Sequence, residues 1–180
     1  MTLKEKALRL ALIAHKEQLR KSDGSPYIAH PIMVGLILQE AGFSELVIAA
    51  AFTHDVLEDT SVTRDELSSE LGEELAVIVD GVSEDMGLEW EVRKENYARG
   101  VASSSEEIMA VSIADKIHNA ESVIGDYEQK GKDVWLPFNR GKDKKIWFEE
   151  LLYTEVSKSW DHPLLSRYKK AIETLKTLEE

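Results

Sequence analysis

Apolar residues recur at helical spacing along nearly the whole chain. Leu3, Ala7, Leu10, Ala11 and Ala14 each have another member of the set three or four positions away, the spacing that brings side chains to one face of an α-helix. Strand-like alternation of apolar and polar residues is rare. The pattern therefore predicts an all-α fold, a compact bundle of roughly seven to nine helices.

Capping residues and helix breakers divide this pattern into segments. Pro31 suits the first turn of a helix, because the N–H that proline lacks has no helical partner there. Ser44 is a helix cap, and the string from Thr63 to Glu66 is a capping box. Helices are predicted after the first one over residues 32–40, from Ser44 into the His54-Asp55 pair, from Thr63 to Gly72, and over 73–82, 90–101, 106–124, 143–159 and 163–178. Loops are predicted over residues 20–27, 83–90 and 125–142.

Length and composition narrow the class of protein. The 180 residues fit one domain over 1–180, of ordinary globular size. The absence of cysteine excludes disulfides and thiolate metal sites, and it suits a reducing compartment. The first residues lack the apolar run of a signal peptide, and no stretch has the length and apolarity of a membrane span. We therefore expect a cytoplasmic protein without a membrane partner.

The net charge restricts the partners further. A formal net charge of −12 should repel DNA, RNA and anionic membrane surfaces. A polyphosphate substrate would be repelled as well, unless a metal ion and a local basic cluster reverse the field at the site. We expect a small molecule as the partner and no nucleic acid. Assembly into a homo-oligomer is left open by the sequence.

Four ionisable residues occupy six positions directly after an apolar segment. They are His54, Asp55, Glu58 and Asp59. If the helix continues through them, His54 lies over Glu58 and Asp55 lies over both acids, because positions three and four apart share a face. A solvated helix end is the simpler interpretation, but carboxylates beside core residues need a counter-charge. We expect the His-Asp pair to bind a cation and the two acids to face what that cation binds.

Two further positions complete a candidate ligand set. His30 stands at a loop-to-helix junction, where Pro31 fixes the backbone. Asp115 lies in the middle of a predicted helical stripe shared with Ile108, Val111, Asn119 and Ser122. Alone, this histidine is more often a cap or a core residue, and this aspartate more often pairs with a lysine or arginine. With the His54-Asp55 pair they form a nitrogen and carboxylate set that suits manganese, iron, cobalt or zinc.

The order His…His-Asp…Asp resembles the HD phosphohydrolase superfamily. It is most similar to its alarmone hydrolase branch, the hydrolase domain of RelA/SpoT proteins and their small stand-alone homologues. The strings that carry the resemblance are Arg20-Lys21-Ser22, Gly24 to Pro31, His54 to Thr60, Val79 to Val82 and Ala114 to Asn119. They keep the family's order over roughly residues 5–125, so residues 126–180 are interpreted as a C-terminal helical extension.

The resemblance implies a function and a role for each matching residue. The reaction is hydrolysis of the 3′-pyrophosphate of guanosine tetra- or pentaphosphate, which yields pyrophosphate and GDP or GTP. The cofactor is one divalent ion, expected to be Mn²⁺, with Fe²⁺, Co²⁺ or Zn²⁺ as alternatives. By position, the metal ligands are His30, His54, Asp55 and Asp115, the catalytic acids are Glu58 and Asp59, and the nucleotide contacts are Arg20, Lys21, Ser22, Asn119 and Ser122.

Three positions depart from the family pattern. Glu121, Ser112 and Glu84 stand where the family usually has basic residues, and each change predicts a less cationic cleft. An alternative is therefore an HD phosphohydrolase that releases orthophosphate from another nucleotide, such as a nucleoside monophosphate or NADPH. A non-catalytic nucleotide-binding module is a third hypothesis. The intact acidic pair argues against it, since two acids beside a phosphate do not help binding.

Overall fold

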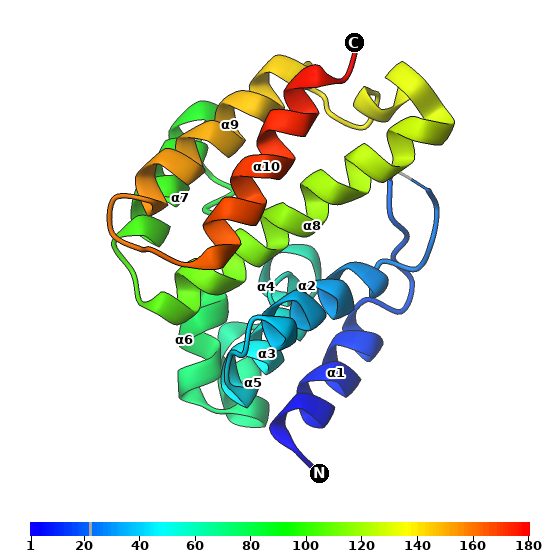
Figure 1. Cartoon of the computed structure of the whole chain (residues 1–180). Helices are drawn as coiled ribbons and strands as arrows, with labels where there is room; N and C mark the ends of the chain where they lie inside the picture. Colours follow the sequence, from blue (N-terminus) through cyan, green and yellow to red (C-terminus); the bar gives the residue numbers. More distant parts are fainter. Residues whose placement is uncertain (22) are drawn as a thin grey trace.

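Helices make up the regular structure of residues 1–21 and 23–180, the part of the chain that this computed structural model describes (Figure 1). The expected all-α fold is confirmed. The elements are α1 (Leu3–Ala14), α2 (Ala29–Glu40), α3 (Glu45–Phe52), α4 (Val56–Asp59), α5 (Arg64–Leu71), α6 (Glu73–Gly81), α7 (Trp90–Ala102), α8 (Glu106–Lys130), the 3₁₀ helix η1 (Gly131–Trp135), α9 (Gly141–Val156) and α10 (Pro163–Thr177). Within these described ranges, no helix is both long and apolar enough to cross a membrane.

The long helix α8 runs through the middle of the molecule, with α2 on one side and α10 on the other (Figure 1). Every residue from Ile108 to Asp115 is buried. A helix buried on all faces needs apolar residues at nearly every position, and this run is apolar except for Ser112 and Asp115. The core that surrounds it draws on helices from α1 to α10. The carboxylate of Asp115 is thereby brought to the centre of the fold.

The helix before the His54-Asp55 pair ends earlier than expected. α3 stops at Phe52, and residues 53–55 form a turn before the single-turn helix α4. The buried Thr53 hydroxyl donates to the carbonyl oxygens of Ala49 and Ala50, which diverts the backbone from the helical path. The prediction of one continuous helix through His54 is therefore wrong. The pair lies on a turn between two helices.

The predicted loop over 125–142 is also largely wrong. α8 continues through Gly125 to Lys130, and Gly131, with a positive φ of 53°, ends it. The chain then folds back as η1, whose Val134 and Trp135 are buried in a small cluster with residues of α8 and α10. Burial of these two side chains outweighs the weak helix propensity of the glycines. The capping box at Thr63, in contrast, is confirmed.

Close contact between α2 and α3 depends on a glycine. A Cβ on Gly35 would lie 2.3–3.2 Å from atoms of the Phe52 ring. We expect Gly35→Ala to lower the free energy of unfolding by about 1–3 kcal/mol, the usual cost of overpacking a core. Chemical denaturation measures it. Gly100→Ala on α7 is the matched control, because its new Cβ meets nothing within 4 Å and the better helix propensity should stabilise. Equal effects of the two substitutions would contradict this account of the contact.

Candidate active site

The backbone presents the His54 ring with one nitrogen free. Nδ1 of His54 lies 2.8 Å from the carbonyl oxygen of Ala51. A carbonyl only accepts, so Nδ1 carries the proton and Nε2 keeps its lone pair. Nε2 is buried and has no hydrogen-bond partner among the described residues. A buried imidazole nitrogen oriented in this way by the backbone is the arrangement found for metal ligands.

His30, in the first turn of α2, points its ring at the same place. Its Nε2 lies 3.0 Å from Oδ1 of Asp115 and 3.6 Å from Oδ2 of Asp55. Its Nδ1 lies 2.7 Å from Nδ1 of His118, so one of these two nitrogens donates to the other. Burial, with the nearby His30, lowers the pKa of His118 to about 4. A neutral His118 can therefore fix the orientation of His30 at ordinary pH.

The four predicted metal-binding residues come together from α2, α8 and the turn after α3. One ligand atom from each of His30, His54 and Asp115 lies within 4.8 Å of the others. Oδ2 of Asp55 lies 3.1 Å from His54 Nε2 and accepts a hydrogen bond from the Tyr27 hydroxyl. Two imidazoles and two carboxylates without sulfur suit a first-row divalent ion. The free Nε2 of His54 fits the same ion.

Charges around Asp115 keep its carboxylate ionised. Burial raises its pKa, but the Lys116 ammonium and the two histidines outweigh this and hold the pKa well below its usual value. Lys116 donates to one oxygen of Asp115, and the Asn119 amide donates to the other at 2.6 Å. The carboxylate is thus held in one orientation by its own helix. The predicted stripe of Asp115 and Asn119 on α8 is confirmed.

The predicted acidic pair stands on α4, next to this cluster. Oε1 of Glu58 accepts a hydrogen bond of 2.7 Å from the backbone N–H of Glu84. Desolvation raises the pKa of Glu58. Desolvation and the nearby Asp55 charge raise the pKa of Asp59. Carboxyl groups with raised pKa values exchange protons closer to neutral pH, as acid–base catalysts need.

Arg20 and Lys21 are positioned by a closed loop. The backbone N–H of Arg20 donates to the carbonyl of Ser25 at 2.8 Å, and that of Tyr27 donates to the carbonyl of Gln18 at 2.9 Å. These bonds return the chain to α2, and both cations line a cavity. Ser22, the third predicted residue of this loop, lies outside the described residues.

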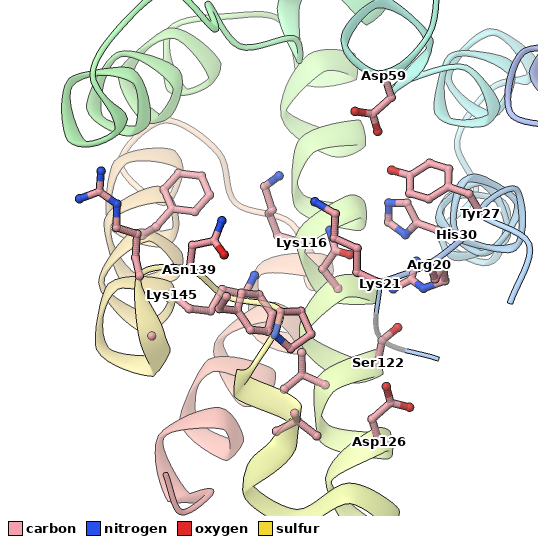
Figure 2. Close-up of a pocket in the computed structure, with 18 of the residues that line it drawn as sticks. Arg20, Lys21, Tyr27, His30, Asp59, Lys116, Ser122, Asp126, Asn139 and Lys145 are labelled. Carbon is pink, nitrogen blue, oxygen red and sulfur yellow. The ribbon is translucent and has the colours of Figure 1, made fainter. Parts of the chain in front are cut away.

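The cavity has a volume of about 900 Å³ and is open to solvent. Figure 2 shows Tyr27 and His30 on one side and Asn139 and Lys145 on the other, with Lys116 between them. Of the residues predicted from the sequence, it is lined by His30, Asp59, Arg20, Lys21, Asn119 and Ser122. The cavity therefore joins the histidine–aspartate cluster to the predicted nucleotide contacts in one space, and that space is large enough for a nucleotide.

Most of the cavity's positive charge comes from residues that sequence reasoning missed. Besides Arg20 and Lys21, the lining cations are Arg93, Lys94, Lys116, Arg140 and Lys145. The lining carboxylates among the described residues are Asp59 and Asp126. The basic run over 140–145 in so acidic a chain was the available signal. The side chains that line the cavity therefore carry more positive than negative charge, in a chain whose net charge is −12.

Of the three departures from the family pattern, Glu84 is the one that contacts cations lining the cavity. Glu121 forms two contacts of 2.7 Å with Arg167 of α10. The buried Ser112 shares a hydrogen bond of 2.8 Å with the Tyr97 hydroxyl, and Glu84 pairs with two cations of α7. None of the three is among the described residues that line the cavity. Glu84 therefore offsets part of the charge of two cations that line the cavity, and the expectation of a less cationic cleft stays a prediction.

Curated relatives match about two thirds of the chain. The probable guanosine-3′,5′-bis(diphosphate) 3′-pyrophosphohydrolase of Synechocystis sp. is 36% identical over 124 residues, which is 66% of this chain and 16% of that protein. The guanosine-3′,5′-bis(diphosphate) 3′-pyrophosphohydrolase of Aquifex aeolicus is 33% identical over 133 residues, which is 72% of this chain and 19% of that protein. The chain thus spans less than a fifth of the length of these relatives.

Solved structures match the fold over most of the chain. A metazoan orthologue of SpoT, described as hydrolysing ppGpp, superposes with a TM-score of 0.81 over 96% of this chain and 95% of its own, at 24% identity. A Listeria monocytogenes protein superposes with a TM-score of 0.75 over 80% of this chain and 96% of its own, at 32% identity. The family profile described as HD domain matches residues 7–144. The protein therefore belongs to the metal-dependent HD domain family.

Proposed function

We propose that the protein is a guanosine-3′,5′-bis(diphosphate) 3′-pyrophosphohydrolase that uses one Mn²⁺ ion and acts in the cytoplasm. The observation that carries the proposal is the cluster of His30, His54, Asp55 and Asp115 beside a nucleotide-sized cationic cavity. The names of the curated relatives support the substrate. The acidic surface of the chain as a whole argues against nucleic acid as a substrate.

The four clustered side chains would hold the ion. When bound, it would polarise the phosphoryl group and activate a water molecule. His54 would bind through Nε2, because Nδ1 is committed to the Ala51 carbonyl. The Tyr27 hydroxyl restrains the Asp55 carboxylate. Tyr27 would therefore act as a positioning residue, and such outer contacts usually change metal affinity or activity by about 10- to 100-fold.

The acidic pair would handle the protons of the reaction. Asp59 lines the cavity, and its backbone carbonyl accepts a hydrogen bond from the Gln18 amide. Its raised pKa suits it to exchange a proton with the attacking water or with the leaving 3′-oxygen. Glu58, held by the backbone N–H of Glu84, stands beside it as the second group. Arg20 and Lys21 would neutralise phosphate charge in the cavity that they line.

Product analysis tests the proposal directly. The purified protein is incubated with Mn²⁺ and guanosine tetraphosphate, and in parallel with a nucleoside monophosphate and NADPH. We expect release of pyrophosphate and GDP from the alarmone and little turnover of the others. Release of orthophosphate from another nucleotide, with the alarmone untouched, would contradict the proposed substrate while leaving a metal phosphohydrolase. Absence of turnover with every phosphate ester would favour a binding module.

A further inference from the structure

Three of the lysines that line the cavity each form an ion pair with a carboxylate. Their side chains are only 12–14% exposed, and the partner carboxylates are at most 9% exposed. The three carboxylates are not among the residues that line the cavity. Two of them stand behind their lysines, whereas Asp115 faces the histidine–aspartate cluster. We call these three lysines the lysine wall. The pairs are Lys94 with Glu84, Lys116 with Asp115, and Lys145 with Glu149.

The pair formed by Lys145 and Glu149 is the most buried of the three. Glu149 of α9 is fully buried, and it accepts hydrogen bonds from Lys145 and from the Tyr168 hydroxyl of α10. Burying a carboxylate in a helical core is costly, and an apolar pair of the same size is often at least as stable. The network is therefore poorly explained by stability alone. Its geometric effect is to hold the Lys145 ammonium in one place at the cavity.

The pair at Lys94 brings a second cation to the same region. Nζ of Lys94 lies 4.4 Å from the centre of the Phe148 ring, and Nζ of Lys116 lies 5.7 Å from it. The two ammonium groups repel each other, and an anion bound between them would reduce this repulsion further than their own carboxylate partners do. Each lysine has three N–H donors and gives at least one to its carboxylate. Donors are therefore left for a ligand that carries several acceptor oxygens.

The lysine wall is distinct from Arg20 and Lys21, the cations predicted from the sequence to contact the nucleotide. Lys145 lies across the cavity from Arg20 and His30, with Lys116 between them (Figure 2). A substrate with one phosphate chain at the metal cluster would leave this side unused. We infer that the lysine wall is a second anion site, which binds the phosphate chain that the enzyme does not hydrolyse. For the proposed substrate, on which this inference rests, that chain is the 5′-diphosphate.

Two substrates that differ only in this chain provide the test. Guanosine tetraphosphate carries both diphosphates, whereas guanosine 3′-diphosphate lacks the 5′-phosphates. We expect Lys94→Met and Lys145→Met each to lower kcat/KM for the tetraphosphate by roughly 10- to 100-fold, mainly by raising KM. A loss of this size is expected when one hydrogen bond to a charged group is removed. The same variants should change kcat/KM for guanosine 3′-diphosphate by less than about threefold. An equal loss on both substrates would overturn the inference.

Controls separate this result from misfolding and from failure of the proposed function. Lys176→Met removes an exposed lysine that also pairs with carboxylates, Glu150 and Glu173, and should change neither substrate. Lys94→Met leaves Glu84 paired with Arg93, so it remains a usable variant if Lys145→Met does not fold. If the wild-type protein does not hydrolyse the alarmone, calorimetry with GDP tests the same site. Weaker GDP binding by Lys94→Met than by Lys176→Met supports the inference, and equal binding overturns it.

Discussion

Replacing Asp55 by alanine should abolish phosphohydrolysis and weaken binding of Mn²⁺ by at least roughly 100-fold, since loss of even an outer contact of a metal site costs about 10- to 100-fold. Asp55 is the ligand candidate that the Tyr27 hydroxyl restrains, and its Oδ2 lies within 3.6 Å of both histidine Nε2 atoms. Without it, the cluster keeps one carboxylate for two imidazoles. Calorimetric titration with Mn²⁺ and a steady-state pyrophosphate assay measure the two effects.

Thermal unfolding gives a second measurement of the same loss. A metal that binds only the folded state stabilises it in proportion to the logarithm of its concentration. We expect added Mn²⁺ to raise the Tm of the wild-type protein and to leave the Tm of the Asp55→Ala variant nearly unchanged. Asp126→Ala is the matched control, because Asp126 lines the same cavity and lies away from His30 (Figure 2). Equal metal responses of the two variants would show that Asp55 is not a ligand.

The local parts of this site could be predicted from the sequence because they occur in short strings. His30 precedes Pro31 at a helix start, and His54 and Asp55 are adjacent, so their order along the chain already groups them. Asp115 and Asn119 are one helical turn apart on α8, and a hydrogen bond joins them. Their meeting with the histidines depends on how α2 and α3 pack on α8. The family's order of motifs predicted that packing, and periodicity alone does not.

The cationic side of the cavity could not be predicted in the same way. Lys94 and Lys145 belong to α7 and α9, which pack against each other although about fifty residues separate them. Each was one charged residue among many on a helix. The partner of Lys94, Glu84, lies in the loop before α7, and the partner of Lys145, Glu149, lies one turn further along α9. The break at Thr53 was missed for a related reason. A hydroxyl that bonds to the preceding turn competes with the helix, and apolar spacing does not record that competition.

Replacing the acidic pair should stop the chemistry while leaving the metal bound. We expect Glu58→Gln and Asp59→Asn each to lower kcat by roughly 10²- to 10⁴-fold, the usual contribution of a general acid or base. Both changes keep the shape of the side chain, and the amide oxygen of the Glu58→Gln variant would still accept the hydrogen bond from the Glu84 N–H. Stability should therefore change little. Single-turnover measurements with guanosine tetraphosphate separate the chemical step from binding.

The metal affinity of these variants decides how the result is interpreted. The carboxylates that contact the Nε2 atoms of His30 and His54 are those of Asp55 and Asp115. Glu58 and Asp59 are outside this set, so the Mn²⁺ affinity of their variants should stay within about threefold of the wild type. Loss of turnover with retained affinity assigns the pair to proton transfer. Loss of both would make one of the acids a ligand. Retained turnover in both variants would exclude them as the acid–base groups, because an amide neither takes up nor releases a proton near neutral pH.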